Sequence, residues 1–236
     1  MFVVTDTVPA PPWRTPRKAA APRQPLSVEL VLSTALRIVD REGLDALSMR
    51  RVAQELGTGA ASLYAHVSSK EDLLEQLIDR VIGEVALPEV DPDRWVEQLK
   101  QVHHERRRVF LGHRDLLRAA RGNVPIGPNS LRMTEVTLGL LRSGGVPDRY
   151  AAWTLDQLAQ LVVADVVEGS AHQTRGGDPA VFFTQLRDYL AALPADRFPN
   201  LVRMADALVE GDGDARFAFG LDLMIDGLAA LAERDA

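Results

Sequence analysis

Cysteine is missing from all 236 residues of the chain. Without a thiol, the protein can form no disulfide, no thiolate zinc site and no cysteine nucleophile. A chain without covalent cross-links suits a reducing compartment, and its 46% content of hydrophobic residues is enough to build a buried core. We therefore expect a folded intracellular protein whose function does not depend on thiol chemistry.

Long uncharged apolar runs are also missing. A membrane-spanning helix needs about 20 predominantly apolar residues, but the best candidate here, residues 151–167, is interrupted by Asp156, Gln157, Gln160 and Asp165. At the N-terminus the basic residues follow a short apolar start, which is the reverse of the order in a signal peptide. The sequence therefore predicts a soluble, cytoplasmic protein with no membrane partner.

Strand-like alternation of polar and apolar residues is a third absence. Apolar residues recur instead at helical spacing, and clusters of Gly and Pro separate the periodic segments. Beyond the first ninety residues, these segments are 95–111, 130–141, 150–168, 181–193, 201–209 and 215–232. We predict an all-α protein with a flexible basic, proline-rich arm (1–25), a small helical head (26–72) and a larger helical body (73–236).

The head carries helix start and stop signals at short intervals. Ser27 is placed to cap a first helix that ends at Gly43, and Ser48 is placed to cap a second helix that ends at Gly57. The first helix has two apolar rows, Val31, Ala35, Ile38 and Leu32, Leu36, Val39. A third, short helix fits residues 59–66, with Leu63 and Val67 toward the core, and the Ser68–Glu71 spacing of a capping box predicts a fourth.

The turn between the second and third helices reads LGTGAAS (56–62), one residue short of a dinucleotide-binding glycine loop. Such a loop follows a strand inside a βαβ unit, whereas here an amphipathic helix comes first and Ser62 replaces the third glycine. Two short helices joined by a tight turn and packed on a longer one are typical of a helix-turn-helix. The phosphates near this turn are therefore expected to be those of DNA.

Charge is distributed unevenly along the chain. Residues 1–70 carry nine Lys/Arg against six Asp/Glu, a net +3, whereas residues 71–236 carry eighteen against twenty-seven, a net −9. This asymmetry fits a DNA-binding head on an acidic body, although a basic solvated face would give the same count. The arm residues Arg14, Arg17, Lys18 and Arg23 either follow DNA or belong to an unstructured extension.

The stretch LSMRRVAQELGTGAASLYAHVSSKEDLL (47–74) resembles the DNA-binding domain of TetR-family transcriptional regulators. The resemblance implies that the residues meeting DNA are Ser48, Arg50, Ser62, Tyr64, His66 and Lys70. Arg50 is the candidate for bidentate reading of a guanine, and Lys70 can neutralise a phosphate. Structural alternatives exist for three of them: Tyr64 packing its ring on the neighbouring helices, His66 as a cap or surface residue, and Ser48 as a helix cap.

Shorter matches in the body, RWVEQL, GHRDLL, VVEG and FAFGLDLMIDGL, look like the ligand-binding domain of tetracycline repressors. The resemblance implies a small-molecule effector and a homodimer formed through residues 150–168 and 215–232. The second of these helices has an apolar stripe that is long for one small neighbour, Phe217, Leu221, Met224, Ile225, Leu228 and Leu231, and its Gly220 and Gly227 would permit close contact.

The residues that would hold a metal–tetracycline complex are replaced in this chain. The corresponding positions are Ala86, Val102, Ala120 and Asn123, and Glu168 alone looks retained. We therefore expect no metal, no cofactor and a more apolar effector, which would be lodged among Val102, Arg106, Phe110, Asn123, Val136, Trp153 and Glu168. Arg106 is available either to an acidic ligand or to an internal salt bridge with Glu168.

Catalytic constellations are not evident. The HHERRR stretch places Arg108 where a zinc-binding HExxH motif needs its second histidine, and His113 fits a hydrogen-bonded corner better than a metal site. We predict a ligand-responsive DNA-binding regulator, most simply a dimeric repressor released from a palindromic operator by its effector, and not an enzyme. The alternatives are a transcriptional activator, or a helical enzyme or small-molecule carrier whose head only mediates assembly.

Overall fold

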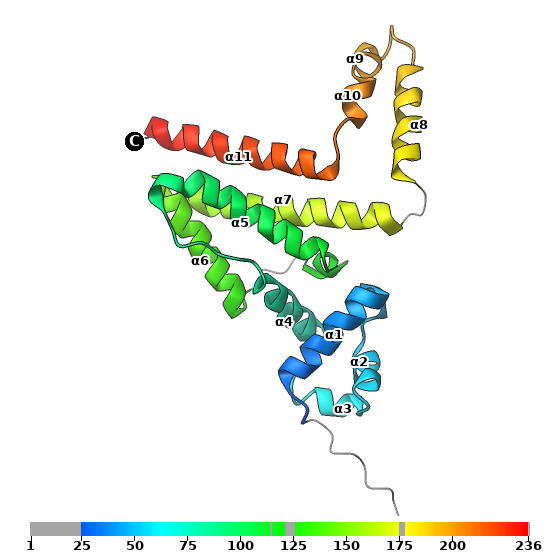
Figure 1. The fold of residues 1–236 in the computed structure, drawn as a ribbon, viewed down its shortest axis with the longest axis vertical. Helices are drawn as coiled ribbons and strands as arrows, with labels where there is room; N and C mark the ends of the chain where they lie inside the picture. The colour runs from blue at the N-terminus through cyan, green and yellow to red at the C-terminus, as the bar shows by residue number, and fades with distance from the viewer. Residues whose placement is uncertain (1–24, 114, 121–125, 175–177, 236) are drawn as a thin grey trace, which may run out of the picture.

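The computed structural model describes residues 25–113, 115–120, 126–174 and 178–235 (Figure 1). The head comprises α1 (Val28–Glu42), η1 (Leu44–Ala46), α2 (Met49–Glu55) and α3 (Ala60–Leu63), and α4 (Lys70–Ile82) leads out of it. The remaining elements are η2 (Pro92–Arg94), α5 (Trp95–Leu111), η3 (Leu116–Ala120), α6 (Pro128–Ser143), α7 (Asp148–Thr174), α8 (Pro179–Ala191), α9 (Pro199–Arg203), α10 (Ala205–Val209) and α11 (Gly213–Asp235). Within these ranges no strand occurs, and the predicted all-α class is confirmed.

The helices form a head, a body and a projection made of α8, α9 and α10 (Figure 1). In the body, α5 packs on α6, α7 and α11, whereas α8, α9 and α10 stand away from it and pack mainly on one another. Helix α4 contacts α1 in the head and both α5 and α6 in the body. The predicted boundary between residues 72 and 73 falls inside α4, so this helix is shared by head and body.

Local signals set the helix ends in the head. Ser27 caps α1 by accepting a hydrogen bond from the Leu30 amide (3.2 Å), and Gly43, at φ 88°, ends the helix. Side-chain capping of this kind contributes about 1 kcal/mol. Both predicted apolar rows of α1 are buried, which leaves its charged residues outside.

Three helix predictions need correction. Ser69, and not Ser68, caps α4 by accepting from the Asp72 amide (3.1 Å), while the Asp72 carboxylate accepts from the Ser68 amide and hydroxyl. The α-helical part of the third helix ends at Leu63, and a turn continues to His66. The segment predicted as one helix over 201–209 is instead two short helices that meet at Met204.

The body is held together by apolar side chains around α5. Fully buried members include Leu99, Phe110, Leu140, Leu158, Val162, Phe217, Leu221 and Ile225. Each such side chain contributes about 1.5–3 kcal/mol by leaving water. Among the described helices, none is both long enough and apolar enough to cross a bilayer.

Candidate DNA interface and effector site

Helices α2 and α3 form the predicted helix-turn-helix. Gly57 ends α2 with φ 62°, and the Thr58 amide donates to the Ala53 carbonyl (2.9 Å), so the chain turns sharply into α3. Gly59 has φ −82° and open space where a Cβ would stand. Only the first of the two glycines is therefore required by backbone conformation.

The recognition segment has one buried and one exposed face. Leu63 and Val67 are buried at 0% and 1% exposure, as predicted, whereas Ser62 is exposed and Tyr64 is 55% exposed. Because more than half of the Tyr64 surface is exposed, its side chain can contact a ligand even though part of it packs on the head. The two buried side chains lie one helical turn apart, and the side chains of residues 61, 62, 64 and 65 are exposed, so one face of this segment is open to solvent.

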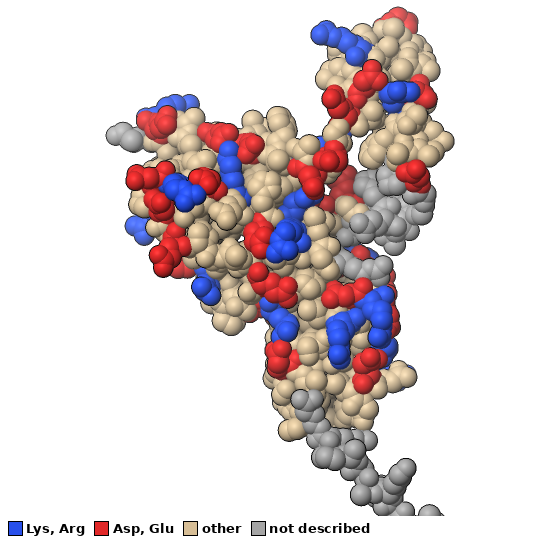
Figure 2. Space-filling view, viewed as in Figure 1, with Lys and Arg blue, Asp and Glu red and all other residues tan. Residues whose placement is uncertain are grey.

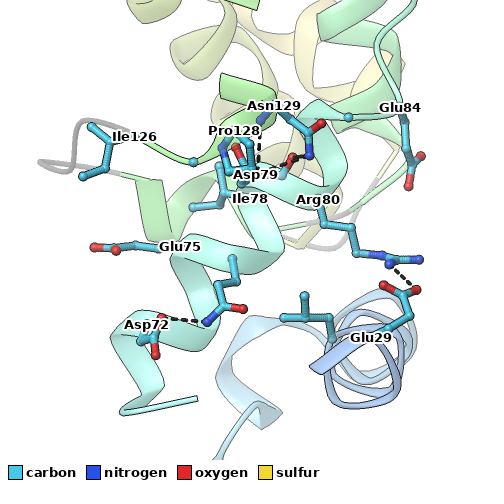
Figure 3. A pocket seen from close by; sticks show the side chains of 14 residues that line it. Glu29, Asp72, Glu75, Ile78, Asp79, Arg80, Glu84, Ile126, Pro128 and Asn129 are labelled. Atoms are coloured by element: carbon cyan, nitrogen blue, oxygen red, sulfur yellow. Dashed lines mark hydrogen bonds and ion pairs between the residues drawn. The ribbon is translucent and has the colours of Figure 1, made fainter. Parts of the chain in front are cut away.

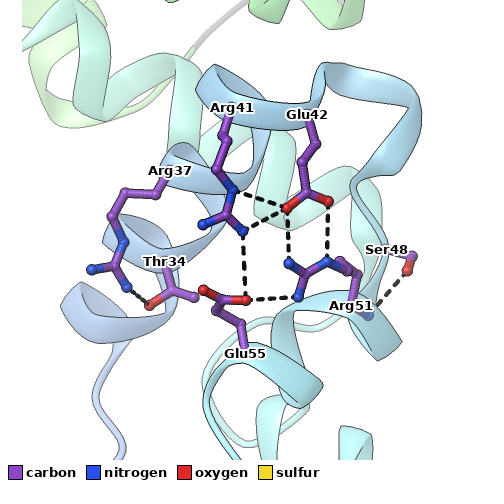
Figure 4. Close-up of polar contacts among 7 residues, drawn as sticks. All are labelled: Thr34, Arg37, Arg41, Glu42, Ser48, Arg51 and Glu55. Carbon is purple, nitrogen blue, oxygen red and sulfur yellow. Dashed lines mark hydrogen bonds and ion pairs between the residues drawn. The ribbon is translucent and has the colours of Figure 1, made fainter.

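Two adjacent arginines of α2 have different environments, and Figure 4 shows that of Arg51. Arg51 is held by Glu42 at the end of α1 through two hydrogen bonds (2.8 and 3.2 Å) and by Glu55 one turn further along α2 (2.8 Å), and Arg41 joins the same cluster. These hydrogen bonds lower the pKa of Glu42 to about 2. Arg50 is exposed and has no ion pair within the described part of the chain, so its guanidinium is available to a ligand outside the head.

The other predicted DNA residues lie near the same face with mixed roles. Ser48 is exposed and accepts from the Arg51 amide (3.1 Å), so it caps α2, which is compatible with a DNA contact. His66 is half-buried in the turn after α3, and Lys70 is half-buried at the first position of α4. The six predicted residues therefore lie at the start of α2, in α3 and the turn after it, and at the first position of α4.

The head itself has no excess of positive charge. Residues 26–70 contain five Lys/Arg and five Asp/Glu, so the surplus of the first seventy residues comes from residues 1–24, which lie outside the described residues. Figure 2 shows Lys and Arg interspersed with Asp and Glu over the visible face. The head therefore has no broad positive surface with which to attract DNA. The feature of Arg50 that suits it to a DNA contact is that it has no acidic partner in the described part of the head.

The predicted effector residues fall into two groups. Val102, Arg106 and Phe110 lie on successive turns of α5 and are buried, and Val136 of α6 is half-buried and packs against the core. Trp153 is 58% exposed on α7, where its ring meets Tyr150 and the Arg149 guanidinium. Asn123 lies outside the described residues.

Helix geometry separates Trp153 from the other group. Arg107 is bonded to Asp165, so neighbouring Arg106 is level with that part of α7, which is about 18 Å along the helix from Trp153 at 1.5 Å per residue. Glu168 is exposed near the Asp165 level. Arg106 forms no ion pair with Glu168, so the internal salt bridge, one of the two alternatives given for Arg106, does not form.

A cleft at the junction of head and body was not foreseen (Figure 3). It has a volume of about 640 Å³ and lies between α1, α4 and the start of α6, and its lining includes Glu29, Asp72, Glu75 and Arg80, with Arg80 bonded to Glu29. None of the predicted effector residues line it. Its acidic rim distinguishes it from the apolar setting predicted for the effector.

At the floor of this cleft, Asp79 of α4 fastens the start of α6. Its Oδ1 accepts from the Ser130 amide and hydroxyl (both 2.8 Å), and its Oδ2 accepts from the Asn129 amide (3.3 Å) and side chain (3.2 Å). A Cβ on Gly127 would collide with the Asp79 carboxylate. Sequence reasoning missed this contact, because nothing in the chain relates residues fifty positions apart.

His113 makes a second connection between head and body. Its Nδ1 lies 3.2 Å from an Asp40 carboxylate oxygen of α1, and its Nε2 lies 3.3 Å from Glu84 beyond the end of α4. The predicted hydrogen-bonded corner is confirmed for His113, although Arg114 lies outside the described residues. Over the described ranges, no group of three or more His, Asp or Glu is arranged to hold a metal ion.

The exposed faces of α7 and α11 carry large apolar side chains. Trp153, Phe219 and Leu223 are 58%, 70% and 66% exposed. Most of the stripe that suggested a dimer surface from the sequence points inward instead: Phe217, Leu221, Ile225 and Leu228 are buried within the protomer, and Met224 and Leu231 are half-buried. The apolar residues left for a partner are therefore a different set on the same helices.

Two family models match the chain. Residues 31–77 match "Bacterial regulatory proteins, tetR family", and residues 87–232 match "Tetracyclin repressor-like, C-terminal domain". The first match contains the helix-turn-helix, and the second begins after α4 and covers most of the body.

Individual relatives agree with these matches. An HTH-type transcriptional regulator of Saccharopolyspora erythraea is 31% identical over 97% of this chain and 95% of its own, and the HTH-type transcriptional repressor DrrR1 of Streptomyces coeruleorubidus is 30% identical over 93% and 83%. The structure of the TetR family protein ActR of Streptomyces coelicolor in complex with actinorhodin is 50% identical, covers 90% of this chain and 99% of that one, and has a TM-score of 0.84. With its helix-turn-helix head and helical body, the chain belongs to the TetR family and is a DNA-binding transcriptional regulator, not an enzyme.

Proposed function

We propose that the protein is a cytoplasmic, dimeric repressor that binds a palindromic operator and leaves it when a small molecule binds the body. The observation that carries this proposal is the free Arg50 beside the exposed recognition segment, while the neighbouring Arg51 is locked inside the head. DrrR1, a relative over most of the chain, is named a repressor, which supports the proposed sign of regulation. Bacterial DNA lies in the cytoplasm, which supports the proposed location.

The proposed DNA contacts divide by chemistry. Arg50 reads a guanine through its two parallel N–H donors, and Tyr64 and Ser62 donate to bases or phosphates from α3 and the turn after it. Lys70 neutralises a phosphate, and Ser48 and His66 add polar contacts at the edges of the interface. Small residues at Ala60 and Ala61 allow the backbone to approach the groove closely.

The dimer is proposed to form through α7 and α11. Trp153, Phe219 and Leu223 would leave water when a second copy packs on this face, and Gly227 has open space above it where a partner helix can approach. A two-fold axis through this face gives the particle two heads. Two heads related by such an axis match a palindromic DNA site.

The effector is proposed to bind beside α5, among Val102, Arg106, Phe110, Val136 and Glu168, with Asn123 as a further predicted contact. ActR, half of whose residues match this chain, is known in complex with actinorhodin, so we propose an effector related to that compound. The signal would reach the head through α4, because Asp79 bonds this helix to the start of α6. A ligand that favours one position of α6 thereby favours one position of the head.

A gel-shift titration on the DNA upstream of the gene tests the proposal. Wild type should bind a palindromic fragment, and Arg50→Ala should weaken binding by about 1–3 kcal/mol if its guanine contact is lost. Tyr64→Ala should also weaken it. Arg142→Ala, which removes an exposed arginine of the body, is the matched control and should bind as wild type does.

Two outcomes would count against the proposal. Wild type that binds no palindrome at modest salt would contradict operator recognition, and Arg50→Ala that binds as well as wild type would contradict the assigned contact. A reporter gene under the same promoter decides the sign of regulation, because a repressor lowers its expression and actinorhodin or a related compound restores it.

A further inference from the structure

Two basic side chains of α5 are fully partnered by carboxylates of the neighbouring helices. Lys100 bonds to Asp222 and Asp226 of α11, and Arg107 bonds to Asp165 of α7 and Asp214 of α11, at distances of 2.5–2.9 Å. The Arg107 guanidinium also lies 4.9 Å from the centre of the Phe217 ring. These four carboxylates of α7 and α11 are therefore already ion-paired with Lys100 or Arg107.

Two further polar side chains of α5, Arg106 and His103, have buried nitrogens without hydrogen-bond partners in the described part of the chain. Arg106 is 6% exposed, and its buried Nε has no hydrogen-bond partner within the described part of the chain. His103, almost one helical turn earlier, is 1% exposed, and neither of its ring nitrogens has a hydrogen-bond partner in the same part of the chain. The other basic side chains of α5, Lys100, Arg107 and Arg108, each have a carboxylate partner among the described residues, and only Arg106 has none there.

Such groups are costly to keep in a folded protein. More than nine in ten buried polar groups in native structures are hydrogen-bonded, and an uncompensated buried charge destabilises the fold strongly. Burial lowers the pKa of Arg106 to about 10 and that of His103 to about 3. At neutral pH the arginine therefore remains a cation, and the histidine is neutral with one N–H donor and one acceptor.

We propose that the effector bears a carboxylate, which Arg106 binds through its paired N–H groups while His103 forms a hydrogen bond with a neighbouring polar group of the same molecule. The inference rests on the proposed effector site and names the chemical class of its ligand. Arg offers donors in the planar fork that matches a carboxylate, and such charge-assisted bonds are strong where water is excluded. Val102 and Phe110, buried on the adjacent turns, provide apolar contact for the rest of the molecule.

A ligand role and a structural role predict opposite effects on the unliganded protein. If Arg106 waits for a ligand, Arg106→Met replaces an unpaired buried charge with an apolar side chain of similar length and should raise the melting temperature. Arg107→Met is the contrasting variant: it strips Asp165 and Asp214 of their partner and should lower the melting temperature. Arg108→Met, at an arginine whose side chain is 69% exposed, should change little.

Two matched probes test the ligand class, anthraquinone-2-carboxylate and anthraquinone-2-carboxamide, titrated into the full-length dimer. The acid should bind wild type more tightly than the amide, and Arg106→Met should weaken the acid about ten- to a hundredfold, as expected for charged hydrogen bonds, while leaving the amide unchanged. His103→Phe should weaken the acid to a smaller extent.

The inference is overturned if Arg106→Met unfolds at a lower temperature than wild type, or if wild type does not prefer the acid, including the case in which neither probe binds. Failure of the proposed regulatory function would look different. In that case the acid preference and its loss in Arg106→Met persist, but the operator gel shift is absent or does not respond to ligand.

Discussion

Replacing Asp79 with Ala should destabilise the protein by about 3 kcal/mol. The carboxylate is 8% exposed and accepts two short hydrogen bonds from Ser130 (2.8 Å each) and two longer ones from Asn129. Hydrogen bonds to a charged group contribute about 1.5–3 kcal/mol each, and counting only the two short bonds at the lower value gives about 3 kcal/mol. For a chain of this size that loss lowers the melting temperature by about 6–12 °C.

Thermal and denaturant unfolding followed by circular dichroism measures this loss. Glu75→Ala is the matched control, because Glu75 is exposed on the same helix and should change the unfolding free energy by less than about 0.5 kcal/mol. Asp79→Ala that unfolds within about 1 kcal/mol of wild type would refute the assignment of this carboxylate as the fastening between α4 and α6.

The same variant also tests signal transmission. Below its melting temperature, Asp79→Ala keeps the whole of α2 and α3, so it should still retard operator DNA in a gel. Release by effector should require more ligand than in wild type, because displacement of the start of α6 is no longer passed to α4. Unchanged release at the wild-type ligand concentration would show that the signal travels by another route.

Three further outcomes are expected. Gly57→Ala should cost about 1–2 kcal/mol because its φ of 62° is unfavourable for a side chain, whereas Gly59→Ser should stay within about 0.5 kcal/mol of wild type, as unfolding curves of the two variants will show. Leu223→Asp, placed on the exposed face of α11, should shift the protein toward monomer in light scattering while its helical circular dichroism is kept. Ion pairing with Arg51 lowers the pKa of Glu42 from 4.5 to about 2, so its contribution is complete above pH 4.5 and is lost as the pH falls toward 2; Glu42→Gln should flatten acid unfolding in that window.

Signals confined to a few neighbouring residues made much of the head predictable. Ser27 and Ser48 cap their helices, and Gly57 turns the chain, because a cap or a positive φ depends on the adjacent backbone alone. The burial of Leu63 and Val67 could be predicted because the two apolar residues are four positions apart, which places them on one face of a helical segment. The misplaced cap of α4 has a local cause too: two consecutive serines precede the helix, and only the backbone path decides which one caps it.

Features that join distant segments were beyond sequence reasoning. Arg50 and Arg51 are equivalent in the sequence, and their roles separate only once the end of α1 places Glu42 beside Arg51. One weak signal existed, since Glu55 stands four residues after Arg51, the spacing of a helical ion pair. Trp153 shows the same limit: its residue type suggests a ligand contact, but the sequence does not tell which face of α7 carries its side chain, and that face is exposed.

The close contact of Gly127 with Asp79 limits what can vary at the junction. There is no room for even one carbon atom on residue 127, so α4 and α6 meet without slack, and a displacement of one is carried to the other with little loss. Under the proposed function, the junction would decide how far a movement of α6 displaces the head, while side chains along α5 would decide which molecule is bound. Redesign of the protein as a sensor for a new molecule should therefore alter α5 and leave residues 79 and 127 untouched.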